Sequence, residues 1–150
     1  WVIQKHIKGF AINIGAGRDR IRGTFTLDNL QHRSYTDWKV VPDIEADACN
    51  MPFDNESIDT LIAMHLWEHI IDPNQFLREA WRILKRGGKL CLILPNGDYL
   101  SDVVYWRDPT HQWLATPDEV LPLTAGWEVV QWNRLKRWCY PWSFDVVLQK

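Results

Sequence analysis

Short apolar runs alternate with helical patterns along this chain, and this alternation restricts the fold more than any other feature. The five runs lie at residues 10–15, 24–28, 40–47, 60–64 and 89–94. A helix is predicted between the last two, with Asp72 as its N-cap, Pro73 in its first turn and Gly87–Gly88 closing it. Strands that alternate with helices form parallel sheets with right-handed crossovers. We therefore expect an α/β fold with a Rossmann-like, doubly wound and mostly parallel sheet.

The last third of the chain follows a different pattern. A second helix is predicted to begin at Thr116, which forms a capping box with Glu119, and to stop at Gly126. Residues 127–135 and 142–148 then alternate like two strands, which is typical of a C-terminal antiparallel strand pair. With 150 residues, no repeat and no linker, we expect a single domain over residues 1–150. The chain begins with Trp1 rather than Met, so we also expect an N-terminal segment to be missing.

Composition excludes several classes of protein. The formal net charge of −2 at pH 7 argues against nucleic-acid partners and against polybasic binding to membranes. No apolar run reaches the ~18 residues that a membrane span needs, and no signal peptide opens the chain. The three cysteines form no C-x-x-C pair, so we expect a reducing compartment, the cytoplasm. Ten residues are Trp, which is typical of either an aromatic binding surface or a bulky core.

A glycine turn, Gly15-Ala16-Gly17, directly follows the first predicted strand. Ligands of open α/β sheets bind beyond the carboxyl ends of the strands, and glycine lets the backbone approach a ligand closely. Asp28 ends the second predicted strand and can accept two hydrogen bonds from the hydroxyls of a ribose. The dinucleotide fingerprint instead needs a third glycine, where this chain has Arg20, and an acid ~20 residues further on. The turn therefore indicates an adenosine-containing cofactor other than NAD, unless it is only a tight strand exit.

Six segments, in order and with matching spacing, resemble the class I S-adenosylmethionine-dependent methyltransferases, in particular the small stand-alone members of the type 11 group. The matching segments are residues 11–17, 26–28, 46–53, 57–59, 64–69 and 84–90. The resemblance runs from about Phe10 to Asn96 and continues more loosely to the C-terminus. It implies a Rossmann-like fold, S-adenosyl-L-methionine as the cofactor and methyl transfer as the activity.

The resemblance also implies which residues bind the cofactor, at the ends of the first four strands. These residues are Asn13, Gly15, Ala16, Gly17, Asp28, Asn29, Asp47, Ala48, Cys49 and His65. In the family pattern, the glycine turn passes under the methionine part, Asp28 holds the ribose and Asp47 accepts the adenine amino group. His65 faces the sulfonium or the acceptor. Asn13 departs from the pattern, because the family usually has an acid there that supplies a charge for the ammonium group of the cofactor.

His111 is the candidate catalytic residue. It lies between the fifth strand and the following helix, where we expect the acceptor to enter, and histidine is the residue type that most often acts as a general base. A solvated loop histidine without a catalytic role is the alternative, and it stays open. Trp67, Trp106 and Trp113 fall on the loops around this edge and are candidate walls for a sulfonium or an apolar acceptor.

Residues 65–69 spell H-x-x-E-H, the zinc motif of one group of metalloproteases. That chemistry needs both histidines on one long helix, whereas His65 follows a predicted strand and the next helix begins only at Asp72. We therefore expect no metal, and we interpret Glu68 and His69 as hydrogen-bonding groups that brace the loop. A basic run at residues 134–137 is compatible with a phosphate-bearing acceptor or with a solvated sheet edge.

The function that these observations favour is methyl transfer from S-adenosyl-L-methionine to a small-molecule acceptor such as a metabolite or a sugar. Two alternatives remain. The first is a non-catalytic module that binds the cofactor or a partner on a methyltransferase fold, and Asn13 is part of its support. The second is an NAD-dependent oxidoreductase, against which the short distance between Gly17 and Asp28 argues. The sequence does not indicate the acceptor atom or the oligomeric state.

Overall fold

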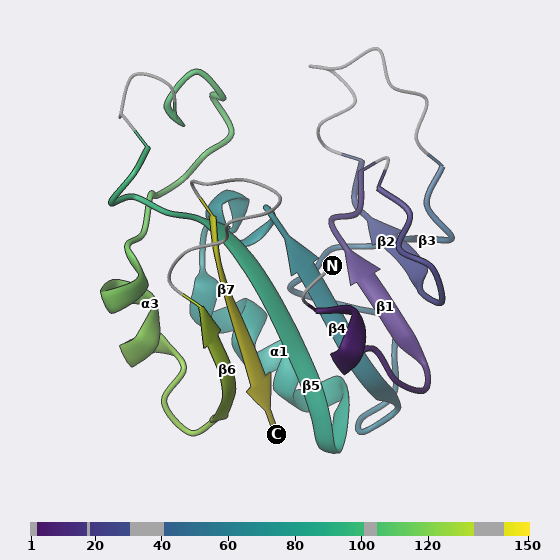
Figure 1. The fold of residues 1–150 in the computed structure, drawn as a ribbon. Helices are drawn as coiled ribbons and strands as arrows, with labels where there is room; N and C mark the ends of the chain where they lie inside the picture. The colour runs from purple at the N-terminus through teal and green to yellow at the C-terminus, as the bar shows by residue number, and fades with distance from the viewer. Residues whose placement is uncertain (1–2, 18, 31–40, 101–104, 134–142) are drawn as a thin grey trace.

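The computed structural model describes residues 3–17, 19–30, 41–100, 105–133 and 143–150, and these residues are arranged around one central sheet (Figure 1). Within these ranges the sheet has seven strands in the order β3-β2-β1-β4-β5-β7-β6. The strands are β1 (Ala11–Ile14), β2 (Phe25–Asp28), β3 (Ile44–Glu45), β4 (Ile58–Met64), β5 (Leu84–Pro95), β6 (Glu128–Asn133) and β7 (Ser143–Gln149). Strands β1 to β5 are parallel, and β7 is antiparallel to both β5 and β6. The predicted Rossmann-like sheet with a C-terminal antiparallel pair is therefore confirmed.

Helix α1 (Pro73–Ile83) connects β4 to β5 and begins as the sequence predicts. The Asp72 carboxylate accepts hydrogen bonds from the backbone amides of Asn74 and Gln75, at 3.0 and 3.1 Å. The prediction that Gly87–Gly88 closes the helix is wrong, because α1 ends at Ile83 and the chain enters β5 at Leu84. Leu84 is fully buried and pairs with Ile58 of β4, so tertiary packing ends the helix before the glycines.

Helix α3 (Pro117–Leu123) precedes β6 and has the predicted capping box, in which the Glu119 carboxylate accepts from the Thr116 amide at 2.8 Å. The two sides of this helix differ in burial. Val120 is fully buried, whereas Leu121 is 45% exposed. Across the part of the chain that the structure describes, no helix is both long enough and apolar enough to span a membrane.

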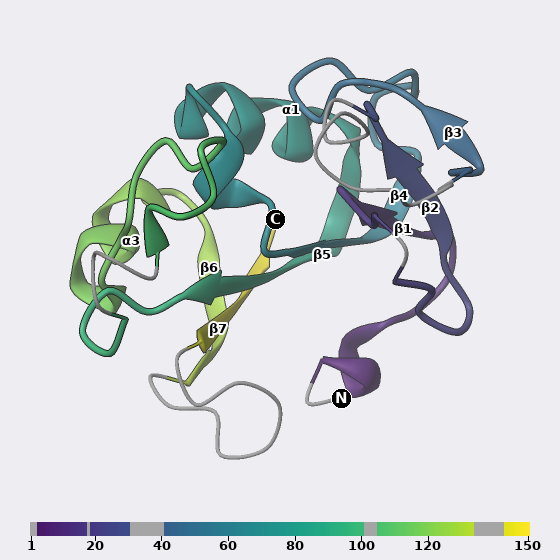
Figure 2. The same ribbon diagram turned by 90° about the horizontal axis from the view of Figure 1, so that it is seen from above.

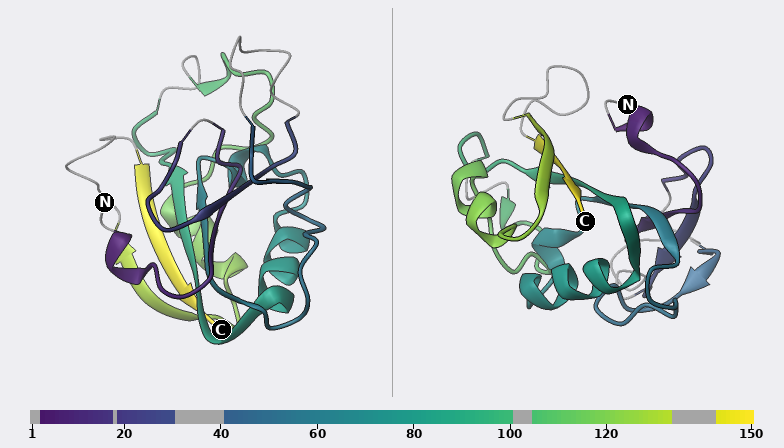
Figure 3. Two further views of the ribbon diagram at one scale, coloured as in Figure 1. Left: turned by 90° about the vertical axis from the view of Figure 1, so that its right-hand side faces the viewer. Right: turned by 90° about the horizontal axis from the view of Figure 1, so that it is seen from below.

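The two faces of the sheet are covered by different elements. Helices α1 and α3 share one apolar core with the sheet, to which Phe76 of α1 and Val120 of α3 belong. The N-terminal segment with the 3₁₀-helix η1 (Gln4–His6) lies on the opposite face, as the views from above, from the side and from below show (Figures 2 and 3). Ile3 of this segment packs in a separate, smaller core cluster with Ile62 and Ile93.

Candidate cofactor-binding and active site

The strand order reverses between β1 and β4, which lie side by side at the middle of the sheet. Strands β2 and β3 follow outward from β1, and β5 lies on the other side of β4. Open α/β sheets bind their ligands beyond the carboxyl ends of the strands at such a reversal. The glycine turn follows β1 and His65 follows β4, so the fold brings these two predicted features to the same edge.

The two glycines of the turn serve different purposes. Both have a left-handed backbone, with φ of +61° at Gly15 and +51° at Gly17. A Cβ at Gly15 would lie 2.5 Å from Cδ1 of Leu66, so packing requires glycine there. A Cβ at Gly17 would meet nothing within 4 Å among the described atoms. Gly17 therefore leaves its backbone open to an approaching ligand.

Asp28 lies beside the glycine turn, as the sequence predicts. One carboxylate oxygen accepts a hydrogen bond from the Gly17 amide at 2.9 Å, and the other accepts from the Leu30 amide at 2.8 Å. The carboxylate therefore fixes the end of the turn relative to β2. Asp28 is partly exposed and Asn29 is exposed. The hydrogen bonds use one lone pair on each oxygen, which leaves acceptor capacity for two hydroxyl groups.

Asn13 is the buried polar residue of β1 and is 1% exposed. Its Nδ2 group donates to the carbonyl oxygen of Asp19 at 3.0 Å. Its Oδ1 atom is buried and has no hydrogen-bond partner among the described residues. A buried acceptor without a donor costs free energy, so this position fits a ligand that brings a positively charged donor.

The segment expected on the adenine side forms a tight turn. The Asp47 carboxylate accepts from the Cys49 amide at 2.8 Å, and the Asp47 carbonyl oxygen accepts from the Asn50 amide at 3.0 Å. Asp47 is exposed and Ala48 is buried. Burial, with a further contribution from the charge of Asp47, raises the pKa of the Cys49 thiol to about 11. The thiol is therefore protonated at neutral pH and is not a nucleophile.

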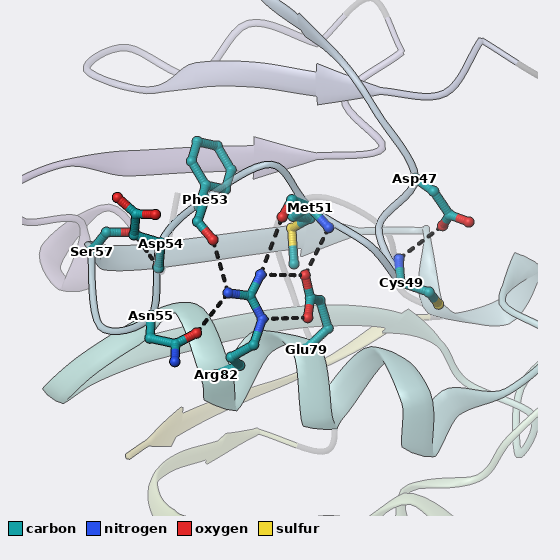
Figure 4. A network of polar contacts seen from close by, with 9 residues as sticks. All are labelled: Asp47, Cys49, Met51, Phe53, Asp54, Asn55, Ser57, Glu79 and Arg82. Atoms are coloured by element: carbon teal, nitrogen blue, oxygen red, sulfur yellow. Dashed lines mark hydrogen bonds and ion pairs between the residues drawn. The ribbon is translucent and has the colours of Figure 1, made fainter.

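An ion pair on α1 supports the chain directly after this turn, and the sequence analysis missed it (Figure 4). Arg82 donates to both carboxylate oxygens of Glu79 at 2.8 Å and to the carbonyl oxygen of Phe53 at 2.8 Å. Glu79 in turn accepts from the Met51 amide at 2.7 Å. The Arg82 hydrogen bond holds the pKa of Glu79 below its usual value. The opposite charges three residues apart were the available signal, but such pairs usually lie on a solvated helix face.

His65 lies at the end of β4 with a left-handed backbone, φ +50°. Its Nδ1 atom is 3.3 Å from a carboxylate oxygen of Glu68 in the 3₁₀-helix η3 (Trp67–His69). Its Nε2 atom is 3.3 Å from the hydroxyl of Ser143, the first residue of β7. The C-terminal strand therefore contributes a residue to this edge, which no local sequence pattern indicated.

His111 lies against the Tyr105 ring, with the ring centroids 4.0 Å apart and nearly parallel. Its Nδ1 atom is 2.8 Å from the Tyr105 carbonyl oxygen. A carbonyl only accepts hydrogen bonds, so Nδ1 carries a proton, and in the neutral ring the lone pair is on Nε2, which lies 4.0 Å from a carboxylate oxygen of Asp108. The side chain is only 15% exposed, so the ring is packed within the loop and not solvated. Its catalytic role stays a prediction.

The three tryptophans considered as walls differ in their surroundings. Trp67 is 1% exposed and belongs to the core, so it presents no wall to a ligand. Trp113 packs edge-on against Trp67, with ring centroids 5.5 Å apart, and donates its Nε1 hydrogen to the Ile70 carbonyl oxygen. Trp106 is 50% exposed and is the one of the three that presents a large surface. The basic run at residues 134–137 lies outside the described residues.

Comparison with known proteins gives the following relationships. Residues 25–92 match a family model described as a methyltransferase domain. The chloroplastic 2-methyl-6-phytyl-1,4-hydroquinone methyltransferase of Spinacia oleracea is 44% identical over 52 residues, which cover 35% of this chain and 15% of that protein. Demethylmenaquinone methyltransferase of Corynebacterium urealyticum is 26% identical over 142 residues, covering 77% of this chain and 60% of that protein. This chain therefore spans only part of the length of each of these relatives.

A solved structure shows the same architecture over nearly the whole chain. The crystal structure of an S-adenosylmethionine-dependent methyltransferase from Archaeoglobus fulgidus superposes with a TM-score of 0.77 at 15% identity. The superposition covers 97% of this chain and 89% of that chain. At this identity the likeness shows the fold. The resemblance stated from the sequence is thereby confirmed: residues 25–92 match the methyltransferase domain, and the chain has the fold of the class I S-adenosylmethionine-dependent methyltransferases.

Proposed function

We propose that this protein transfers a methyl group from S-adenosyl-L-methionine to a small-molecule acceptor, as a single domain over residues 1–150. The observation that carries the proposal is the hydrogen bond between the Gly17 amide and the Asp28 carboxylate. This hydrogen bond places the open glycine turn beside an acidic side chain, at the point where the strand order reverses. A nucleoside ligand bound there can lie against the backbone of the turn and donate its ribose hydroxyls to the carboxylate.

The donor and acceptor groups at this edge fit the parts of that cofactor. The free lone pairs of the Asp28 carboxylate suit the two ribose hydroxyls, and the exposed Asp47 carboxylate suits the adenine amino group. The unpaired Oδ1 atom of Asn13 is an acceptor for the ammonium group of the methionine part. Because Asn13 is neutral, this contact contributes less than the charged pair that the family usually has.

The protein has little covalent chemistry to perform in such a reaction. When bound, the sulfonium supplies an activated methyl group, so catalysis consists mainly of holding the acceptor in line with it. The packed ring of His111 holds its Nε2 lone pair in a fixed orientation, where it can accept a proton from an acceptor hydroxyl or amine. The glycine turn and the Asp28 carboxylate orient the cofactor.

Two further parts of the proposal concern the class of acceptor and the cellular compartment. Both curated relatives are named for quinol or quinone-type acceptors, so compounds of this class come first in an acceptor screen, ahead of other metabolites and sugars. We place the protein in the cytoplasm, because the two described cysteines, Cys49 and Cys91, are free thiols.

Calorimetric titration of the folded chain tests the cofactor. We expect S-adenosyl-L-methionine and its demethylated product to bind and NAD not to bind. Asp28→Ala removes charge-assisted hydrogen bonds that contribute roughly 1.5–3 kcal/mol each, so affinity falls by about tenfold or more. Asp54→Ala is the matched control, because Asp54 is an exposed acid outside the predicted site. We expect this variant to bind the cofactor as tightly as the unaltered chain does. Failure of both sulfur compounds to bind overturns the proposal.

Transfer of a labelled methyl group to a pool of acceptors separates an enzyme from a non-catalytic binding module. We expect label in a small molecule, with His111→Gln lowering the turnover number by about a hundredfold if an acceptor proton must be removed. Cofactor binding without transfer to any acceptor in the pool argues for the binding module.

A further inference from the structure

The most concentrated group of metal-ligating side chains lies next to the candidate active site. Among the described residues, Glu68, His69 and His111 each offer one ligand atom, and these atoms all lie within 4.8 Å of one another. Glu68 and His69 belong to η3, after β4, whereas His111 belongs to the loop after β5. We propose that these three residues bind one divalent transition-metal ion.

The carboxylate of Glu68 is the least expected member of this group. Glu68 is only 3% exposed, although an ionised carboxylate is costly to bury without compensation. One of its oxygens is 3.3 Å from Nδ1 of His65. The other, Oε2, is buried and has no hydrogen-bond partner among the residues that the structure describes. A cation at this oxygen compensates the buried charge.

The hydrogen bonds of the two histidines orient their rings as metal ligands. The Thr110 hydroxyl donates to the Asp108 carboxylate, so its oxygen can only accept from the Nδ1 atom of His69, 2.9 Å away. Nδ1 of His111 likewise donates to the Tyr105 carbonyl oxygen. In the neutral form of each ring the lone pair is therefore on Nε2. Metal-binding histidines in proteins almost always have their second nitrogen anchored in this way to an oxygen acceptor.

The chemistry of the three ligands indicates the kind of metal. Two imidazoles and one carboxylate are typical of Zn²⁺ and of other first-row divalent ions, and not of Ca²⁺ or Mg²⁺, which prefer oxygen ligands only. Ligands about 2.0–2.2 Å from a metal ion lie about 3.3 Å apart in a tetrahedral site, so the three groups must close by about 1.5 Å when they bind it.

Two contacts hold the two halves of the site together without the ion. The Gln112 amide donates to the Glu68 carbonyl oxygen at 2.8 Å, and Trp113 packs against Trp67. The rings of His69 and His111 are already 4.7 Å apart. This site differs from the metalloprotease motif, because His65 lies outside η3 and its Nδ1 atom faces Glu68. The expectation of no metal considered only that motif.

The proposal is independent of methyl transfer, since metal binding is measured without cofactor or acceptor. It also limits His111 to one role at a time, because a single lone pair on Nε2 serves either a proton or a metal ion.

Titration of the chelator-treated full chain with Co²⁺ tests the site through the visible absorption bands of the bound ion. We expect one ion per chain, displaced by Zn²⁺. The near-isosteric changes His111→Gln and Glu68→Gln each weaken Co²⁺ binding by about tenfold or more, whereas His6→Gln, on the opposite face of the sheet, leaves it unchanged. Zn²⁺ also raises the unfolding temperature of the unaltered chain but not that of His111→Gln.

Two outcomes overturn the proposal. The first is the absence of cobalt bands at protein and metal concentrations of about 100 μM, which exceed the dissociation constant of an ordinary three-ligand protein site. The second is binding that is equally strong in the unaltered chain, in His111→Gln and in Glu68→Gln, because surface histidines then account for it. Circular dichroism confirms that each variant is folded before it is titrated.

Discussion

The two faces of the sheet differ, because the face opposite α1 and α3 combines a smaller apolar cluster with a buried polar network. On the face covered by α1 and α3, the side chains that project from β5 and β7 are apolar, as at Leu92 and Val146. On the opposite face, Asp145 is fully buried and accepts hydrogen bonds from Gln131 at 2.6 Å and Asn133 at 2.9 Å. Asp145 and Val146 are neighbours on β7 and project to opposite faces, Asp145 into a polar network and Val146 into the apolar core. Apolar packing tolerates small shifts, whereas a buried polar network depends on every partner.

The coverings of the two faces differ as well. Helix α1 lies between η3 and β5 in the chain, in the connection from β4 to β5, whereas η1 belongs to the N-terminal segment. Three contacts hold that segment on the sheet. Ile3 packs in the smaller core, and the backbone of Lys8 makes two hydrogen bonds with the Thr60 hydroxyl. The ring of His6 lies 3.0 Å from the Gln131 side chain. We therefore expect substitutions under α1 to destabilise the whole fold and substitutions under η1 to loosen one segment.

The largest effect is expected at Phe76, which is fully buried under α1. Phe76→Ala removes a fully buried aromatic ring from the apolar core that α1 shares with the sheet, and it leaves a cavity there. The free energy of unfolding falls by about 3–5 kcal/mol, measured by urea denaturation. Arg78→Ala on the same helix is the control. The Arg78 side chain is 69% exposed, so its loss changes stability by only about 0.5 kcal/mol. Similar losses for both variants contradict the assignment of this core.

The sequence predicted the helix-covered face well, because its signals are local. The N-cap at Asp72, the proline in the first turn of α1 and the apolar runs of the strands each depend on a few neighbouring residues. The end of α1 was wrong, because burial of Leu84 against β4 is a tertiary contact that no local pattern contains. The covering of the other face by η1 was not predicted for the same reason.

The same distinction between local sequence signals and tertiary contacts applies to the candidate site. The glycine turn and Asp28 were predicted to lie side by side, since parallel neighbouring strands place their carboxyl ends together. The approach of His111 to His69 depends on how the loop after β5 folds back onto η3. The two histidines are far apart in the sequence, so no local pattern predicted this contact.

A smaller effect is expected under η1, where Ile3→Ala tests the opposite face. Ile3 is fully buried, but its segment can move toward the sheet and partly close the cavity. The loss of stability is therefore about 2 kcal/mol, at the low end for such a substitution. Hydrogen exchange accelerates at residues 4–8 and not in α1. Lys5→Ala, an exposed position on η1, is the control and changes neither quantity. Faster exchange throughout α1 would contradict this expectation, because it would show that the two faces of the sheet unfold together.

The smallest effect concerns a polar contact on the helix-covered side, the pair Glu79–Arg82. Hydrogen bonding from Arg82 lowers the pKa of Glu79 in the folded chain below its ordinary value of 4.5. The folded state therefore binds the Glu79 proton more weakly than the unfolded state does. The pair accordingly stabilises the fold at pH values above 4.5, and this contribution is lost as the pH falls through the lower folded pKa.

Comparison of the unaltered chain with Glu79→Gln isolates that contribution, because protonation of the other carboxylates affects both proteins alike. At pH 7 the variant is less stable by about 1 kcal/mol, as expected for a partly exposed pair, and the difference shrinks steadily below about pH 4.5. Glu45→Gln, at an exposed acid on β3, gives no such pH dependence. A difference that stays constant from pH 7 to pH 3 means that Glu79 acts through packing and not through its charge. In that case the charge of Glu79 does not stabilise the fold, and α1 supports the segment after Asp47 without a contribution from the ion pair.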